Sequence, residues 1–299
     1  MKRKKRIDMA IFKPAFISTL LIILVFAVIS SLTIRSIYLN DYKKELNLNA
    51  ANKAEEIDGF LSRQAAIVNT LITGVEAMDA SDKDAVMDYL ASNLEVNEFA
   101  IMYYYCEDYD GGVYPADKTV LDLDPTTRVW WTQAFAENGI IFTAPYMDFA
   151  SGQMIVTIAG PINGSYEGDA CLLADIAIDT IVGIVNEEVA GSNNISSFLI
   201  DGNGDVVSHE NEEFLPNEDG NTNLAEVLGK EIEPEGFSVF KDYDGTVKYI
   251  ATAAVDNPGW TVGVYQNKSI LALSVVRNIA PVIFLAVVLC VVGMILTWR

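Results

Sequence analysis

Cysteine, histidine and the common catalytic motifs are scarce in this sequence. Its 299 residues include three cysteines and a single histidine, His209. Three cysteines cannot build the disulfide framework of a small secreted scaffold, and one histidine lacks the companions needed for metal binding or acid–base catalysis. The sequence shows no glycine-rich phosphate loop and no nucleophile elbow. We therefore expect no enzymatic activity, no cofactor and no bound metal.

Positive charge is also scarce in the middle of the chain. Residues 35–278 carry 13 Lys and Arg against 40 Asp and Glu, a formal net charge of −27. A surface of this sign repels phosphate backbones, so we expect no nucleic-acid partner. Six further cations lie within residues 1–14, and Arg299 is the last residue.

Two uninterrupted apolar runs lie near the ends of the chain. Residues 15–34 and 279–298 are each 20 residues long without a charged side chain, enough for a helix to cross a bilayer. The basic residues ahead of the first run mark its cytoplasmic end. A cleaved signal peptide is the alternative, but the run exceeds the usual apolar core and no clear cleavage pattern follows it. We predict a two-span plasma-membrane protein with residues 35–278 outside the cytoplasm.

Hydrophobic periodicity divides the exported segment. Apolar residues recur every three or four positions from Tyr42 to Met78, which predicts one long amphipathic helix. Its apolar stripe must pack either within the chain or against a second copy, and we expect a homodimer. Short strand-like runs then follow in two similar sets, which indicates an α+β fold with two tandem modules. The expected boundaries are 1–14 tail, 15–34 span, 35–91 helix and connection, 92–192 distal module, 193–266 proximal module, 267–278 juxtamembrane segment and 279–298 span.

Two further patterns have competing interpretations. Cys106 ends one predicted strand and Cys171 begins another, so they are either a disulfide across neighbouring strands or two buried thiols. Asp201, Asn203 and Asp205 imitate the start of a calcium loop, but the sixth position is Val206, where that loop requires glycine. A hairpin turn is the better interpretation of this segment.

A solitary cation marks the candidate site. Arg128 is the only Lys or Arg between Lys118 and Lys230, and we expect a helix to begin near Pro125 and run to about Glu137. An exposed arginine in a surface ion pair is the ordinary alternative. However, Trp130 and Trp131 follow directly, and aromatic walls strengthen the bidentate hold of a guanidinium on a carboxylate.

Two acids and a tyrosine complete this candidate site. Asp175 interrupts an otherwise apolar strand, and a carboxylate inside such a strand is unfavourable unless a partner pairs with it. Tyr146 and Asp148 stand at the end of a predicted strand, where an ammonium group could meet a carboxylate and an aromatic face. These residues predict a dipolar pocket for a molecule that carries both a carboxylate and an amine.

The order of segments resembles a known family. Basic tail, span, long helix, two modules and second span are similar to the double Cache sensor region of bacterial chemoreceptors and sensor kinases, whose modules are PAS-like. Three segments are similar to the motif of the subgroup that binds amino acids in the membrane-distal module: Arg128-Val129-Trp130-Trp131, Pro145-Tyr146-Met147-Asp148 and Gly168 through Asp175.

This resemblance implies a role for each motif residue. Arg128 and Trp130 would hold the ligand carboxylate, and Tyr146, Asp148 and Asp175 would surround its amino group. The chain departs from the family at two positions: Trp131 stands where a tyrosine is usual, and Leu123 replaces another tyrosine five residues before the arginine. Both changes remove a hydroxyl, which indicates a more apolar ligand side chain.

The leading hypothesis is a transmembrane receptor. Its extracytoplasmic region would bind an amino acid or a related amine-carrying carboxylate and signal across the membrane, most commonly in chemotaxis. A scaffold or interaction module without a small-molecule ligand is the alternative. We expect the cytoplasmic output domain to lie outside this chain, since the sequence ends one residue after the second apolar run.

Overall fold

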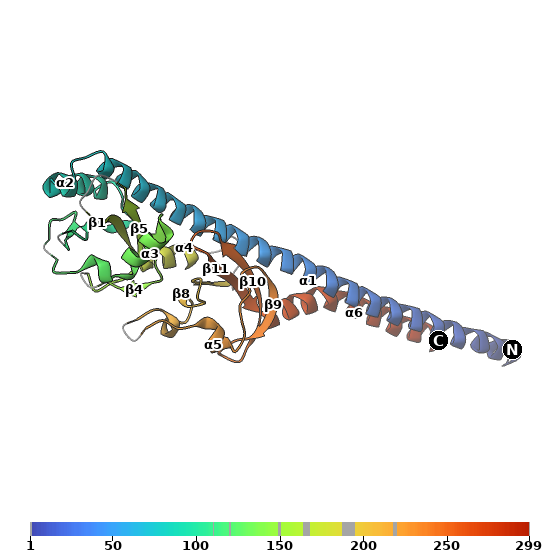
Figure 1. The fold of residues 1–299 in the computed structure, drawn as a ribbon. Coiled ribbons are helices and arrows are strands. Elements are labelled where there is room, and N and C mark those ends of the chain that lie inside the picture. Colours follow the sequence, from blue (N-terminus) through green and yellow to red (C-terminus); the bar gives the residue numbers. More distant parts are fainter. Residues whose placement is uncertain are drawn as a thin grey trace.

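The computed structural model is an elongated α+β molecule in which two sheets lie along one long helix (Figure 1). It describes residues 2–109, 111–119, 121–148, 151–163, 168–186, 195–217 and 220–298.

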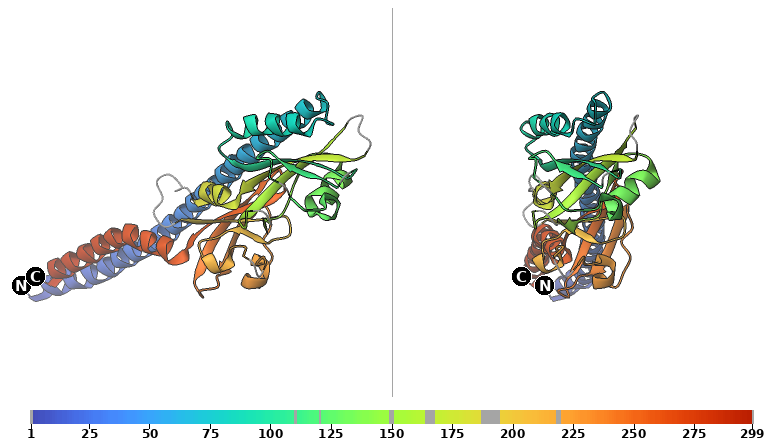
Figure 2. Two further views of the ribbon diagram at one scale, coloured as in Figure 1. Left: turned by 90° about the vertical axis from the view of Figure 1, so that its left-hand side faces the viewer. Right: turned by 60° about the vertical axis from the view of Figure 1, so that its left-hand side comes forward.

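Helix α1 runs without interruption through Lys2–Glu76, and α6 comprises Lys268–Trp298. The apolar ends of the two helices lie side by side, far from the sheets, and both termini are at that end (Figures 1 and 2). Both helices are long and apolar enough to cross a membrane, and their apolar side chains are largely exposed there. The two sheets thus lie at one end of the molecule and the paired apolar helices at the other.

The distal module is an antiparallel sheet in the order β2-β1-β6-β5-β3, with β4 also paired to β5. Helix α3 covers one of its faces, and α4 continues directly from β6 toward the second module. Its elements are α2 Lys83–Leu94, β1 Ala100–Glu107, β2 Val113–Pro115, the 3₁₀ turn η1 Pro125–Thr127, α3 Val129–Glu137, β3 Ile141–Phe142, β4 Tyr146–Met147, β5 Met154–Ile162, β6 Ala170–Ala177 and α4 Ile178–Asn186.

The proximal module repeats this topology. Its antiparallel sheet has the order β8-β7-β11-β10-β9, and β11 runs directly into α6. The expectation of two similarly built modules is confirmed by this shared strand order. The elements are β7 Ser196–Ile200, β8 Val206–Ser208, the 3₁₀ turn η2 Glu212–Phe214, α5 Leu224–Leu228, β9 Gly236–Lys241, β10 Val247–Val255 and β11 Trp260–Asn267.

Helix α1 packs on one face of both sheets. In the distal sheet this face carries Tyr103, Ile158 and Leu172, which join the buried α1 residues in one cluster. The predicted apolar stripe is therefore buried within a single chain, and it gives no support to a homodimer, which stays a prediction. The buried stripe residues are Tyr42, Leu46, Ala50, Ala54, Ile57, Leu61, Val68, Ile72 and Val75.

The predicted helix start at Pro125 is wrong. Residues Pro125–Thr127 form a 3₁₀ turn, Arg128 is extended (φ −89°, ψ 146°), and α3 begins at Val129. The Asp124 carboxylate caps the turn by accepting the Thr126 N–H (2.9 Å), and the Arg128 N–H closes it on the Pro125 carbonyl (3.0 Å). The break sets Arg128 at the N-cap of α3 rather than on the helix surface.

The calcium-like segment is a hairpin turn between β7 and β8. The Asp201 carboxylate accepts the backbone N–H groups of Asn203 (2.8 Å) and Asp205 (2.9 Å), so its oxygen is used within the turn. Among the residues that the structure describes, no cluster of three or more His, Cys, Asp or Glu could hold a metal ion.

Candidate functional site

The candidate site lies on the distal sheet face that points away from α1. Side chains alternate across a strand, so Leu173 and Asp175 of β6 share this face. Tyr104 of β1 is the register partner of Leu173, and Thr157 of β5 is the partner of Asp175. A second buried cluster forms here between the sheet and α3, and it includes Tyr104, Leu173, Trp130 and Trp131.

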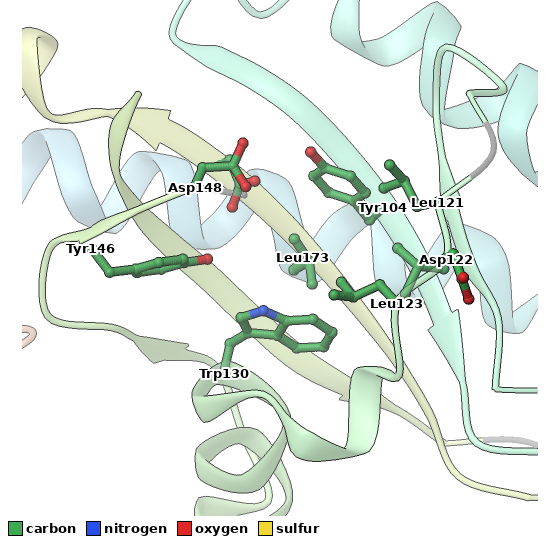
Figure 3. Close-up of a pocket in the computed structure, with 10 residues that line it drawn as sticks. Tyr104, Leu121, Asp122, Leu123, Trp130, Tyr146, Asp148 and Leu173 are labelled. Carbon is green, nitrogen blue, oxygen red and sulfur yellow. The ribbon is translucent and has the colours of Figure 1, made fainter. Parts of the chain in front are cut away.

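A small cavity of about 40 Å³ opens in this cluster (Figure 3). The rings of Tyr104, Tyr146 and Trp130 surround it, while Leu121, Asp122 and Leu123 lie across from Tyr146. Aromatic walls with a few convergent polar groups are typical of a small-molecule site. The lining residues are Tyr104, Val113, Leu121, Asp122, Leu123, Trp130, Tyr146, Asp148, Leu173 and Asp175.

Asp175 is the most deeply buried acid of the cavity, with 4% of its surface exposed. The Thr157 hydroxyl donates to its Oδ1 at 2.6 Å, and the Tyr146 hydroxyl lies 2.6 Å from the same Thr157 oxygen. Burial, with a smaller contribution from the nearby Asp148 charge, raises the pKa of Asp175 to about 7, against the opposing hydrogen bonds from Thr157 and Tyr104. Asp175 therefore titrates near neutral pH instead of remaining a permanently ionised carboxylate.

Asp148 is only partly buried and closes the turn between β4 and β5. Its Oδ2 accepts both the backbone N–H and the hydroxyl of Ser151, each at 2.6 Å. No cation forms an ion pair with Asp148 or Asp175 among the residues that the structure describes. Asp148 and Asp175 thus meet at an aromatic-walled cavity without an ion-pair partner in the part of the chain that the structure describes.

Arg128 stands beside the cavity rather than in its lining. The side chain is half-buried, and its Nε is buried without a hydrogen-bond partner within the described ranges. Burial raises the pKa of Tyr146 well above its usual range, and the positive charge of Arg128 partly offsets that rise. The guanidinium therefore lies near the Tyr146 phenol. A buried and unpaired guanidinium N–H is unfavourable, which makes Arg128 a candidate partner for an anion.

The structure brings four of the six predicted site residues together at the cavity: Trp130, Tyr146, Asp148 and Asp175. Trp131 lies behind them, where its ring packs on Phe135 (centroids 4.7 Å apart) and Trp130 (6.3 Å). It supports the wall instead of forming it.

Sequence reasoning missed several lining residues. Tyr104 is one of three consecutive tyrosines, and only strand register separates it from Tyr103 and Tyr105, which face α1. Leu121 and Asp122 are on the segment between β2 and η1, where the sequence has no periodic signal. Alternation along the predicted strand ending at Cys106 could have indicated Tyr104.

Cys106 and Cys171 are register partners on the same sheet face as the cavity. Both thiols are free and buried in this structure, in agreement with the two-thiol interpretation. Burial raises the pKa of Cys171 to about 12 and that of Cys106 well above its ordinary value, so both thiols are protonated.

Bacterial chemoreceptors are among the sequence relatives of this chain. The methyl-accepting chemotaxis protein PctB of Pseudomonas aeruginosa is 23% identical over 261 residues, which cover 85% of this chain and 40% of PctB. PscA of Pseudomonas syringae pv. tomato is 23% identical over 189 residues, 60% of this chain and 30% of PscA. The chain thus spans less than half the length of these curated relatives.

Solved structures of the same fold include two ligand-binding domains. That of PctB in complex with L-Arg has a TM-score of 0.66 and 21% identity, covering 77% of this chain and 97% of that domain. The ligand-binding domain of the Pseudomonas fluorescens chemoreceptor CtaA in complex with L-isoleucine has a TM-score of 0.68 and 19% identity. The match covers 80% of this chain and 98% of that domain.

Residues 34–275 match the Cache domain family dCache_1, and this match spans most of the chain, including both sheets. With the two-module topology and the chemoreceptor relatives, the match defines a sensor rather than an enzyme. The chain belongs to the Cache domain family, as a chemoreceptor-type double Cache sensor.

Proposed function

We propose that the distal module binds an amino acid, or a related molecule with an amine and a carboxylate, and that this chain is the sensor region of a plasma-membrane receptor. The proposal rests on one observation: Asp148 and Asp175 meet at an aromatic cavity without an ion-pair partner among the described residues. Beside them lies Arg128, whose buried Nε has no hydrogen-bond partner among those residues either. An ammonium would satisfy the acids, and a carboxylate would satisfy the guanidinium.

The aliphatic part of the cavity supports an apolar ligand side chain. Val113, Leu121, Leu123 and Leu173 form this part of the lining. Polar side chains would lose hydration there without gaining hydrogen bonds, whereas aliphatic side chains would bury apolar surface. Amino acids with small aliphatic side chains are therefore the favoured class. The structural relatives bound to L-Arg and L-isoleucine support an amino acid in general terms.

Two hydrogen bonds connect helix α4 of the distal module to α1 and to the proximal sheet. Helix α4 follows β6, the strand that carries Asp175, and its Ile184 carbonyl accepts a hydrogen bond from Lys53 of α1 (2.7 Å). The next carbonyl, that of Val185, accepts one from Ser197 of β7 (2.7 Å). We propose that ligand binding favours one of two arrangements of α4 against α1, and that β11 passes the change into α6. A ligand shifts such an equilibrium only by its differential affinity.

Calorimetry of the full chain in nanodiscs tests this function. Alanine, valine, leucine and isoleucine are compared with aspartate, glutamate and arginine, and Arg128→Ala is compared with the exposed Arg63→Ala as a matched control. We expect saturable binding of an aliphatic amino acid that Arg128→Ala weakens at least about tenfold and Arg63→Ala leaves unchanged. No binding by any amino acid, or equal binding by both variants, would sink the proposal and favour the scaffold alternative.

A further inference from the structure

The proximal module buries a lysine at its sheet. Lys248 of β10 is 4% exposed, and its Nζ pairs with Asp242 and, at 3.0 Å, with Glu210. The ammonium also lies 4.5 Å from the Tyr265 ring centroid and 5.8 Å from that of Tyr243. Two acids and two aromatic rings around one ammonium are the groups that recognise a small amine.

Strand register relates Asp242, one of the two acids that pair with Lys248, to an acid of the distal site. Asp148 follows β4 and Asp242 follows β9, and each stands at the end of a hairpin that leads into the equivalent next strand. In both, the backbone N–H of the acid donates at 2.8 Å to the residue just before that strand, and its carbonyl accepts from a turn glycine, Gly152 (3.0 Å) or Gly245 (2.9 Å). Asp242 is thus the counterpart of Asp148.

The same register identifies the counterpart of the lysine. Ile155 of β5 pairs with Tyr146 of β4, two residues before Asp148. Lys248 of β10 pairs with Phe240 of β9, two residues before Asp242. Lys248 therefore occupies the position that Ile155 holds in the distal module.

The Lys248 ammonium and the groups around it lie on the same side of their sheet as the distal cavity does on its own. Tyr265 packs with Phe198 and Ile250 in a cluster on the face away from α1, whereas Tyr249 packs with α1 on the other face. Lys248 and Ile250 are two residues apart on β10 and share a face. The lysine ammonium is therefore on the ligand-side face of its sheet.

We propose that the proximal module contains an ammonium site equivalent in position to the distal one, and that Lys248 occupies it in cis. The module is then held permanently in an amine-occupied arrangement and does not respond to free amines. Shortening the lysine side chain empties the site and allows a small primary alkylammonium to bind. An ordinary buried ion pair would be stabilising without accepting a free amine in place of the lysine. The proposal does not depend on the identity of the distal ligand.

Chemical rescue of Lys248→Ala tests the proposal. The full chain is studied in nanodiscs with Asp175→Asn present throughout, so that the distal site is disabled. The probe is n-propylammonium, which has the three carbons and the nitrogen that the alanine variant lacks, and 1-propanol and sodium are the neutral and ionic controls. We expect a saturable rise in melting temperature for Lys248→Ala with n-propylammonium alone, and no rise in the parent that keeps Lys248.

A second variant removes the recognition element. Adding Asp242→Asn to Lys248→Ala should weaken the n-propylammonium effect at least tenfold. The same substitution removes one of the two negative charges that Lys248→Ala leaves without a partner. If Lys248→Ala does not fold, n-propylammonium is expected to restore its circular dichroism spectrum, and sodium is not. A response no larger than that to sodium, an equal response in the parent, or an unchanged response with Asp242→Asn would overturn the proposal.

Discussion

The two modules share one strand order but differ in where their positive charge resides. In the proximal module Lys248 of the chain itself stands between Asp242 and Glu210. In the distal module the equivalent strand position is Ile155, and Asp148 and Asp175 have no cation within the described residues. Topology is common to both, so the difference lies in a few side chains on one sheet face.

If the distal module binds the ligand proposed above, this difference separates a stable module from a responsive one. A satisfied buried ion pair fixes its surroundings, because removing either partner leaves an uncompensated charge that costs about 3–5 kcal/mol. An unpaired buried acid does the reverse: it destabilises the empty state and lets a cationic ligand supply the missing charge. Burial accordingly raises the pKa of Asp175 to about 7, whereas the pKa of Lys248 is raised because its hydrogen bonds to Asp242 and Glu210 outweigh desolvation.

Asp175→Asn should have the largest effect on the proposed ligand. The amide keeps the shape of the acid but cannot pair with an ammonium, and losing one partner of a buried charge pair costs about 2–5 kcal/mol. We expect amino-acid affinity to fall at least about 30-fold in calorimetry. Asp179→Asn, at the exposed start of α4, is the matched control and should bind normally. Equal affinities in the two variants would remove Asp175 from the site.

The same variant should stabilise the empty protein. Because the folded pKa of about 7 exceeds the unfolded value of 3.8, ionisation of Asp175 opposes folding. The loss of stability begins above about pH 4 and is complete above about pH 7. At pH 8, Asp175→Asn should therefore raise the free energy of unfolding by up to about 4 kcal/mol, and below pH 4 by little. Denaturant titrations of the empty protein at both pH values measure this, and an equal change at each would contradict it.

Ile155→Lys should convert the distal module into a self-occupied one. A lysine at the position equivalent to Lys248 can reach toward Asp148 and Asp175, as Lys248 reaches Asp242. We expect amino-acid affinity to fall at least about tenfold, because the ligand ammonium must then displace a tethered one. Ile155→Met, of similar length without charge, is the control for altered packing. A lysine variant that binds no worse than the methionine variant would break the correspondence between the modules.

Several features of the molecule could be predicted from sequence because they are periodic or local. The stripe from Tyr42 to Val75, the two apolar runs and the hairpin signals each depend on spacing that neighbouring residues set. The acid at Asp175 was identified because it interrupts an apolar strand, and the structure buries it at the cavity. The ligand contacts assigned to the six motif residues remain predictions.

The rest depended on tertiary register. Whether Tyr104 or Tyr105 faces the cavity is decided by pairing with β6, over 60 residues away in sequence. The extended conformation of Arg128 could not be predicted because Pro125 favours a helix start, whereas the chain forms a 3₁₀ turn there and begins α3 only after Arg128. The role of Lys248 required knowledge that β10 is equivalent to β5, because nothing near Lys248 in sequence marks it as an internal partner for two acids.

Ligand affinity should depend on pH through Asp175. Below its pKa of about 7 the acid is protonated in the empty protein, so an ammonium ligand must displace a proton. Affinity should fall by up to about tenfold per pH unit below 7 and level off above it. Calorimetry at pH 6 in buffers of different ionisation enthalpy should detect proton release of up to one per ligand. Constant affinity between about pH 5.5 and about pH 8 would contradict the assignment.

Tyr104→Phe should have the smallest effect and should sharpen the comparison, because Phe198 of β7 holds the equivalent register position in the proximal module. The Tyr104 hydroxyl favours the ionised form of Asp175, so its removal should raise the pKa of Asp175 further. A single hydrogen bond of this kind is worth about 0.5–1.5 kcal/mol, so affinity at pH 7 should fall about 2- to 10-fold. The loss should shrink toward pH 8.5, where Asp175 is ionised in both proteins.

Tyr105→Phe is the matched control. The Tyr105 hydroxyl bonds to Glu107 on the opposite face of the sheet (2.8 Å), so this variant should leave affinity unchanged at every pH. A loss that persists undiminished at pH 8.5 would instead indicate that Tyr104 contacts the ligand directly, independent of Asp175.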